Sequence, residues 1–361
     1  MLIERVLIVD PVDGEYTGSV QFGEKIERIM KKETDYDYIL MPGFIDPHTH
    51  GLVGIDTMEA SKADYEKWIN ENFSRGVTHF LPTTVSASKA DILHIVKRFK
   101  GVRKSIGGLH LEGPFISIEK KGAQNPEHIR KPSLEELKEI ITDSVRLITM
   151  APEVEGFYEV LPYLTERDVR VSIGHSNAVF EDMAKAFQNN VRRITHFPNG
   201  LRALHHRELG VVGGALYLDF TIELIVDGVH SSPEFVDFTY RIKGADKIIL
   251  ITDSISATGL KDGSYTLGGL DVKVVGGKAT LADGTLAGST LTFDNAVKNF
   301  HRFTHCTLKE LAMVSSYNAA RDLGIKDEAR IKEGYKANFV LLDKELNVVK
   351  TVFEGNMVYK K

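Results

Sequence analysis

The sequence has 361 residues, of which 42% are hydrophobic and 26% are charged. At about 150 residues per domain, this length suggests two domains, or one large barrel with a small appendage. The composition excludes a disordered, collagen-like or coiled-coil chain. Lys and Arg number 45 and Asp and Glu number 50, which leaves a formal net charge of −5. With no basic block in the sequence, we expect no nucleic-acid partner and no membrane partner.

The single cysteine, Cys306, cannot form an internal disulfide, and we expect it to be buried. The first ten residues contain Glu4, Arg5 and Asp10, unlike the apolar segment of a signal peptide. No run approaches the roughly 18 apolar residues that a membrane span needs. We therefore expect a cytoplasmic protein.

The two ends of the chain have a β-type pattern. The pattern predicts short strands at residues 6–10, 18–21, 25–29 and 38–41, separated by turn residues, and further strands in the tail at 337–342 and 348–359. Neither end alone has enough strands to be stable. We therefore expect residues 1–42 and 325–361 to form one small β-sandwich domain.

Residues 43–324 alternate apolar runs with amphipathic stretches such as 63–75, 89–99 and 134–141, which is typical of βαβ units. The apolar runs are 43–50, 77–84, 106–113, 145–151, 169–175, 193–199, 220–228 and 247–254. Eight units predict an α/β fold of the TIM type, a closed (β/α)₈ barrel, rather than a doubly wound sheet. A Gly-rich patch near 261–288 predicts a β-hairpin insertion, and helical patterns resume at 293–303 and 308–315.

Polar side chains end five of these runs. They are His48 and His50, then Glu112 after His110, then His175, His196 and Asp253. Because the C-terminal strand ends of a barrel converge on one mouth, we expect these imidazoles and carboxylates to meet there. His48 and His50 are two residues apart on a strand, so both can face the barrel interior and chelate one ion.

Neutral imidazole and carboxylate ligands suit Zn²⁺, Fe²⁺, Co²⁺ or Mn²⁺. Such an ion makes a bound water acidic, and Asp253 is placed to take the proton and pass it to a leaving amine. The histidines away from the strand ends are expected to be structural; these are His79, His94, His128, His301 and His305.

Residues 42–51, PGFIDPHTHG, resemble the first-strand motif of the amidohydrolase superfamily of metal hydrolases. The resemblance implies a (β/α)₈ barrel with a small β-sandwich built from both termini. Further motifs resemble, in the same order, the N-acetylglucosamine-6-phosphate deacetylase family; they lie at 110–115, 121–124, 174–178, 195–196, 205–208, 227–230, 252–254 and 286–290. This family resemblance covers nearly the whole chain. It implies hydrolysis of the acetamide of N-acetylglucosamine 6-phosphate to glucosamine 6-phosphate and acetate.

The resemblance also implies residue roles. Glu112, His175 and His196 would bind the principal metal, His48 and His50 a second one, and Glu112 would bridge the two. Asp253 would be the proton shuttle. Arg207 and His230 would contact sugar or phosphate; the sugar pocket would be lined by Ala123, Gln124, Asn199, Gly200, Leu286, Ala287 and Gly288. A homodimer is expected by analogy.

The chain departs from the family pattern at Gln124, where some members carry a histidine that helps to polarise the acetyl carbonyl. A glutamine can donate a hydrogen bond but carries no charge. Members also differ at the first strand, and some use one metal. The histidines here permit one or two ions.

Two alternatives remain open at this stage. One is a cyclic amidase, such as a dihydroorotase or hydantoinase, or an N-acyl-amino-acid deacylase. Many of these bridge two metals with a carbamylated lysine, whereas here Glu112 occupies that place. The other is a non-catalytic binding protein on a decayed barrel, which should have lost a ligand or the proton shuttle.

Overall fold

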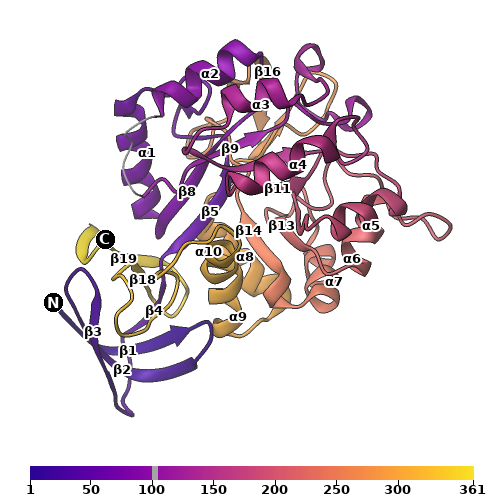
Figure 1. Ribbon diagram of the computed structural model, residues 1–361. Helices are drawn as coiled ribbons and strands as arrows, with labels where there is room; N and C mark the ends of the chain where they lie inside the picture. The colour runs from indigo at the N-terminus through magenta and orange to yellow at the C-terminus, as the bar shows by residue number, and fades with distance from the viewer. Residues whose placement is uncertain (100–104) are drawn as a thin grey trace.

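The computed structural model describes residues 1–99 and 105–361. Within these residues the chain forms a barrel ringed by helices and a smaller sheet beside it, seen at the lower left of Figure 1. Both chain ends lie in the smaller sheet.

The larger part is a parallel barrel. Among the described residues its eight strands pair in chain order; they are β5 (Phe44–Thr49), β8 (Val77–Thr84), β9 (Leu109–Glu112), β10 (Val145–Met150), β11 (Arg170–Ile173), β12 (Arg193–Ile194), β13 (Thr221–Ile225) and β14 (Ile248–Ile251). The backbone N–H of Asp253 donates to the carbonyl of His48 at 2.9 Å, so the last strand meets the first. The predicted (β/α)₈ fold is confirmed.

Helices cover the outside of the barrel because each presents an apolar face to it. In α1, for example, Tyr65, Trp68, Ile69 and Phe73 are buried, and Ser61 caps the helix together with Asp64. The helices are α1 (Lys62–Ser74), α2 (Lys89–Arg98), α3 (Leu134–Ile140), α4 (Phe157–Glu166), α5 (Phe180–Gln188), α6 (Gly210–Tyr217), α7 (Pro233–Lys243), α8 (Phe293–Thr304), α9 (Leu308–Ala312) and α10 (Asn318–Asp322). Short helical turns lie at Ile118–Lys120, Pro126–His128, Ala245–Lys247 and Met313–Tyr317.

The smaller sheet combines both termini. Its order is β20-β19-β18-β4-β1-β2-β3, and the strands are β1 (Leu2–Asp10), β2 (Gly14–Phe22), β3 (Ile26–Lys31), β4 (Tyr38–Pro42), β18 (Phe339–Leu342), β19 (Val348–Phe353) and β20 (Asn356–Lys360). Residues of β1 to β4, β18 and β19 share one apolar cluster, which includes Val6, Phe22 and Phe339. Buried Asp10 forms an ion pair of 2.7 Å with Arg330, which links the two ends of the sequence. The domain boundaries after residues 42 and 324 stay predictions.

A third small sheet follows β14; it contains β15 (Gly263–Leu267), β16 (Leu270–Val275) and β17 (Lys278–Thr280). This antiparallel sheet packs against Val85 and Ile255 in the loops above the barrel, so the region expected to form a hairpin covers the mouth. A short pair, β6 (Gly51–Leu52) and β7 (Ile55–Asp56), follows β5 at the same end.

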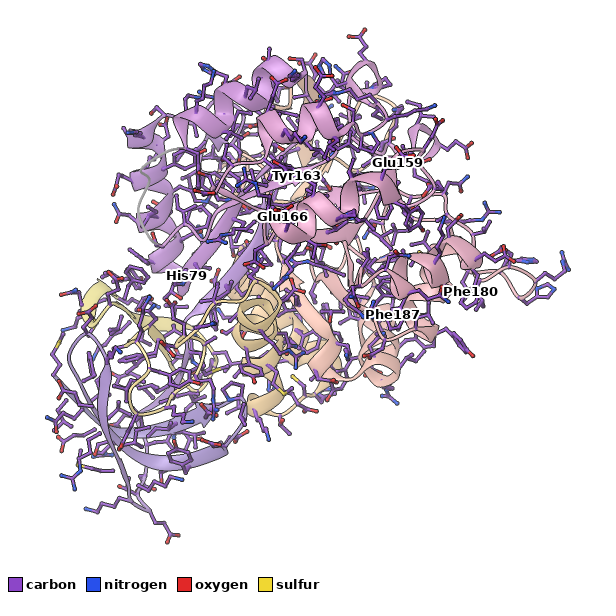
Figure 2. All side chains as sticks on the ribbon, viewed as in Figure 1. His79, Glu159, Tyr163, Glu166, Phe180 and Phe187 are labelled. Atoms are coloured by element: carbon purple, nitrogen blue, oxygen red, sulfur yellow. The ribbon has the colours of Figure 1, made fainter. Side chains whose placement is uncertain are left out.

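The histidine His79 joins the two parts of the molecule (Figure 2). It lies on β8 at the side of the barrel that faces the terminal sheet, with Nε2 3.2 Å from Oε2 of Glu328 and its ring against Phe353. Cys306 is buried, as expected. In the described part of the chain, no helix has the length and apolar character needed to cross a membrane.

Candidate metal centre and active site

Three of the strand-end side chains form a tight group at the mouth of the barrel. Oε1 of Glu112 lies 3.1 Å from Nε2 of His175 and 2.9 Å from Nε2 of His196. The two imidazole nitrogens are 3.1 Å apart. These three ligand atoms come from β9 and from the residues after β11 and β12, as the barrel topology predicts.

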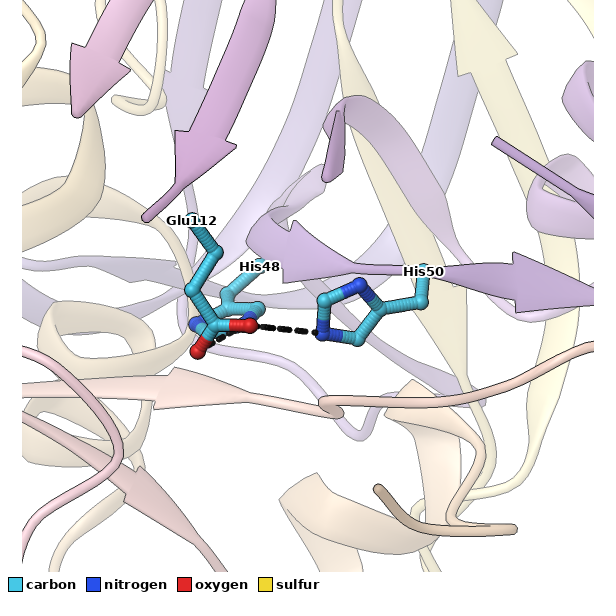
Figure 3. A group of neighbouring side chains, drawn as sticks. All are labelled: His48, His50 and Glu112. Atoms are coloured by element: carbon cyan, nitrogen blue, oxygen red, sulfur yellow. Dashed lines mark hydrogen bonds and ion pairs between the residues drawn. The ribbon is translucent and has the colours of Figure 1, made fainter. Parts of the chain in front are cut away.

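The histidines of the first strand form a second group around the same carboxylate (Figure 3). Nε2 of His48 and Nε2 of His50 are 3.3 Å apart, and they lie 3.6 Å from Oε1 and 3.3 Å from Oε2 of Glu112, respectively. Oδ1 of Asp253 lies 3.1 Å from Nε2 of His50 and 3.4 Å from Nε2 of His48. All six strand-end residues therefore converge, and Glu112 contacts all four histidines.

Every histidine of the two groups turns Nε2 toward the carboxylates and Nδ1 toward an oxygen acceptor. Three of the acceptors are backbone carbonyls: Nδ1 of His50 lies 3.1 Å from the carbonyl of Thr83, Nδ1 of His175 lies 2.8 Å from that of Lys120, and Nδ1 of His196 lies 3.0 Å from that of Asn199. The acceptor for Nδ1 of His48 is a carboxylate. A neutral imidazole that donates from Nδ1 has a free lone pair on Nε2. All four rings are thus oriented as metal ligands.

This donor set fits a divalent cation. With their protons on Nδ1, the Nε2 atoms of His175 and His196 face each other at 3.1 Å as two lone pairs, and the Nε2 atoms of His48 and His50 do the same at 3.3 Å. Facing lone pairs repel unless a positive charge lies between them. His175 and His196 share Oε1 of Glu112, whereas His48 lies nearest Oε1 and His50 nearest Oε2, and all these side chains are buried. Imidazole and carboxylate ligands with no thiolate match Zn²⁺, Fe²⁺, Co²⁺ or Mn²⁺.

The carboxylates at the centre stay ionised despite their burial. Desolvation raises the pKa of Glu112, but the imidazoles of His48, His175 and His196 around it outweigh this effect and hold the pKa well below the usual range. Burial likewise raises the pKa of Asp253, but the neighbouring imidazoles of His48 and His50 outweigh this effect and lower it overall. Both groups can therefore act as anions at neutral pH.

The backbone is strained at three of the six residues. His175, His196 and Asp253 have φ values of 45°, 32° and 51°, in the left-handed region that non-glycine residues rarely adopt. Such conformations persist only where the surrounding structure imposes them, and they cluster at functional sites. Here each turns a side chain over the barrel mouth directly after its strand.

A cavity of about 220 Å³ opens above these side chains. Its lining includes the residues expected to bind the sugar; these are Ala123, Gln124, Asn199, Gly200, His230, Leu286 and Gly288. Leu267 and Thr285 of the inserted region also line it, which the sequence did not indicate. Ala287 lies between two lining residues, with its side chain buried.

Gln124 is hydrogen-bonded at both ends of its amide. Nε2 donates to Oε2 of Glu112 at 2.6 Å, and Oε1 accepts from the backbone N–H of Ser86 at 2.6 Å. The sequence predicted a cavity residue here but not its bond to the bridging carboxylate.

Arg207 and His230 differ in position. Nδ1 of His230 lies 2.7 Å from Oδ2 of Asp227. Burial lowers the pKa of His230, but the hydrogen bond and charge of Asp227 outweigh this and raise it. Arg207 lies in an exposed loop, where its guanidinium contacts His206, and among the described residues that line the cavity Arg207 does not occur.

His110 shares the strand end with Glu112 but does not reach the metal groups. Its Nε2 lies 2.8 Å from Oγ1 of Thr149 and its Nδ1 3.3 Å from Oγ1 of Thr83. Burial and the neighbouring His48 hold its pKa well below the usual range, so the ring is neutral.

The carboxylate that accepts from His48 belongs to Glu223, at 2.9 Å, and the sequence analysis missed it. Glu223 also pairs with Arg193 at 2.6 Å, and both side chains are fully buried. Burial raises the pKa of Glu223, but the charge of Arg193 and the hydrogen bond from His48 lower it far below the usual range. The signal was available, because a glutamate interrupts the otherwise apolar core of β13, TIELI.

The sequence model of the Amidohydrolase family matches residues 39–358. The chain belongs to this family. Among curated proteins, an N-acetylglucosamine-6-phosphate deacetylase of Lysinibacillus sphaericus is 42% identical over 329 residues, covering 88% of this chain and 85% of that protein. An N-acetylgalactosamine-6-phosphate deacetylase of Escherichia coli O157:H7 is 36% identical over 344 residues, covering 92% and 91%.

Solved structures of the same deacetylase family are also similar to this chain. The crystal structure of N-acetylglucosamine-6-phosphate deacetylase from Thermotoga maritima has a TM-score of 0.97 and 51% identity, with full coverage of both chains. A variant of the Mycobacterium smegmatis deacetylase, in complex with N-acetyl-D-glucosamine 6-phosphate, has a TM-score of 0.94 and 28% identity, covering 100% of this chain and 99% of that one. Within the amidohydrolases, the chain belongs to the N-acetylglucosamine-6-phosphate deacetylase family. This membership argues against the cyclic-amidase and decayed-barrel alternatives.

Proposed function

We propose that this protein hydrolyses the acetamide of N-acetylglucosamine 6-phosphate to glucosamine 6-phosphate and acetate. The observation that carries the proposal is the convergence of four imidazoles with Glu112 and Asp253 under one cavity, in a chain of this deacetylase family. A barrel mouth that combines candidate metal ligands, a proton acceptor and a cavity meets the needs of amide hydrolysis.

Glu112, His175 and His196 would hold one divalent ion, and His48 and His50 with Glu112 would hold a second. Zn²⁺, Fe²⁺, Co²⁺ and Mn²⁺ all suit these ligands. When bound, such an ion lowers the pKa of a water and polarises an acyl oxygen.

Asp253 would move the proton. The attacking water gives a proton to the Asp253 carboxylate as its oxygen bonds to the acetyl carbon, and the carboxyl returns that proton to the nitrogen as the C–N bond breaks. The buried carboxylate is an anion before the reaction, as this role requires. Its Oδ1 faces Nε2 of His50, so it lies beside the metal groups under the cavity.

The cavity walls would hold the sugar. Ala123, Asn199 and Gly200 line one part, and the 286–288 segment lines another. A Cβ at Gly200 would lie 3.1 Å from Nδ1 of His175, which shows how closely the backbone approaches the metal ligands there. Gln124 would supply a neutral donor where some family members carry an imidazole.

We propose that His230 and Arg207 bind the phosphate. His230 lines the cavity, and its raised pKa favours the cation. Arg207 lies outside the cavity of its own chain, so it reaches a phosphate only if its loop moves or if a second copy supplies it. The homodimer that we propose allows the second route. A cytoplasmic location also stays a prediction.

A second candidate substrate is N-acetylgalactosamine 6-phosphate, because the relative from E. coli O157:H7 bears that name. The two sugars differ in the orientation of one hydroxyl. The same reacting groups would serve both.

The test is acetate release by the metal-replete protein with both phosphorylated sugars and with unphosphorylated N-acetylglucosamine. We expect the fastest release from N-acetylglucosamine 6-phosphate. Faster release from the galacto sugar would reassign the substrate, and no release from any of the three would overturn the proposed reaction.

A further inference from the structure

Glu223 is a charged side chain at the centre of the barrel wall. It lies in β13 among apolar neighbours and is 0% exposed. A buried carboxylate is costly unless every charge and hydrogen bond is compensated. Its partners therefore indicate why a glutamate stands at this position.

The two oxygens of Glu223 contact different groups. Oε1 accepts two hydrogen bonds from Arg193, at 2.9 Å from Nε and 2.6 Å from Nη2. Oε2 accepts from Nδ1 of His48 at 2.9 Å and from the backbone N–H of His196 at 3.1 Å. One carboxylate thus contacts a residue of each metal group.

Arg193 determines which oxygen of Glu223 contacts which partner. A guanidinium only donates hydrogen bonds and keeps its charge, and Arg193 is itself buried and paired on its other side with Asp322. Oε1 is therefore committed to Arg193, and Oε2 is presented to His48.

His48 differs from the other three candidate ligands in what orients its ring. His50, His175 and His196 donate from Nδ1 to backbone carbonyls, which no side-chain substitution removes. His48 donates to a side chain. Because an ionised carboxylate only accepts, the proton of His48 stays on Nδ1 and its Nε2 lone pair points to His50 and Glu112.

We propose that Glu223 is a positioning residue for metal binding, which holds His48 in the Nδ1–H form and so makes its Nε2 available as a ligand. Arg193 orients Glu223 for this task. The inference rests on the metal dependence proposed above, and it concerns the site formed by His48, His50 and Glu112.

The substitution Glu223→Gln distinguishes control of the His48 tautomer from a purely structural role of the Glu223 side chain. Because the charged guanidinium of Arg193 donates two hydrogen bonds at this position, the amide oxygen faces Arg193. The amide NH₂ then faces His48, and the hydrogen bond from the backbone N–H of His196 is lost. Nδ1 of His48 must then accept, its proton moves to Nε2, and the ligand lone pair is lost. A role limited to the ion pair would change stability but not the tautomer.

The experiment uses full-length protein stripped of metal, without substrate. The ring-nitrogen shifts of ¹⁵N-labelled histidine report the tautomer of His48, whose signals are assigned by their absence in His48→Gln. Zn²⁺ affinity and stoichiometry are measured against a chromophoric chelator. We expect Glu223→Gln to move the His48 proton to Nε2 and to weaken one Zn²⁺ site about 10- to 100-fold.

Glu328→Gln is the matched control. Glu328 is also a buried carboxylate between a histidine and a cation, with His79 at 3.2 Å and Lys336 at 2.7 Å, but away from the metal groups. It should leave the tautomer of His48 and the Zn²⁺ affinity unchanged. An unchanged tautomer and unchanged affinity in folded Glu223→Gln would overturn the proposal.

If Glu223→Gln does not fold, Glu223→Asp keeps the charge beside Arg193 and withdraws the acceptor from His48. It should also weaken Zn²⁺ binding, and wild-type affinity in this variant would contradict the proposal. Since these readouts need no substrate, they are independent of whether the proposed deacetylation is right.

Discussion

The amide nitrogen of Gln124 lies 2.6 Å from Oε2 of Glu112, the oxygen that faces His50. The other end of the amide accepts from Ser86, so Gln124 cannot rotate without losing a bond. A neutral side chain therefore orients the carboxylate that both metal groups share.

Gln124→Ala should consequently weaken metal binding as well as turnover. Loss of a hydrogen bond that orients a metal ligand costs typically 10- to 100-fold in affinity or activity, and we expect about that loss here. Chelator competition for Zn²⁺ measures it. Gln21→Ala, which removes an exposed amide–carboxylate bond to Glu27, should have no effect. Wild-type Zn²⁺ affinity in Gln124→Ala would contradict this role.

Asp253→Asn should abolish proton transfer. The amide keeps the shape but cannot accept a proton, and general acid–base catalysis is worth about 10²- to 10⁴-fold. We expect kcat to fall by that factor while metal content stays close to wild type, as read by acetate release and elemental analysis. Asp262→Asn, in the exposed inserted region, is the control. A near-wild-type kcat in Asp253→Asn would exclude the proposed shuttle.

Binding of the phosphate should depend on the protonation of His230. Its pKa is raised, so the cation is present below that pKa and lost as the pH rises through it. We expect KM for the phosphorylated sugar to increase as the pH rises through this pKa. In Asp227→Asn the pKa falls, so the increase should begin at a lower pH. If KM has the same pH profile in both proteins, His230 does not bind the phosphate as a cation.

Arg207→Ala should raise KM for the phosphorylated sugar and leave the unphosphorylated sugar unaffected, because a guanidinium pairs with phosphate oxygens. Arg241→Ala, which removes a surface ion pair, serves as the control.

A second experiment tests whether another copy of the chain supplies Arg207. The Arg207→Ala and Asp253→Asn proteins are mixed and allowed to exchange subunits. Recovered activity in exchanged dimers indicates supply by the partner, and no recovery indicates movement of the loop within one chain.

Gly288→Ala should disturb Asp253 through the backbone. Gly288 has φ +61°, and a Cβ there would lie 2.5 Å from Cγ2 of Ile255 and 2.9 Å from the carbonyl of Asp253. Gly284 has φ +87° with nothing within 4 Å, so Gly284→Ala incurs only the left-handed strain of about 1–2 kcal/mol. We expect Gly288→Ala to be less stable in denaturant unfolding by a further ~1–3 kcal/mol, and to lose activity. Equal stability of the two variants would refute the steric conflict.

The strand-end residues were predictable because their placement follows from local rules. A run such as 43–50 alternates its side chains between the two faces, and parallel strands end at the same mouth, so His48, His50 and Asp253 could be assigned to one site from spacing alone. His110 lies two residues before Glu112 on β9, yet its ring bonds to threonines of the neighbouring strands instead of joining the metal groups. The position of a residue in a strand predicts the face to which its side chain points, but the groups that this side chain contacts depend on the neighbouring strands.

The sequence by itself determined the barrel, the metal-binding chemistry and the family, since strand periodicity and strand-end residue types are written along the chain. Only the tertiary structure decided that Glu223 and Arg193 meet His48, that Gln124 binds Glu112, and that Arg207 lies outside its own cavity. These contacts join residues distant in sequence, and their distances depend on how strands and loops pack across the barrel, which no local pattern encodes.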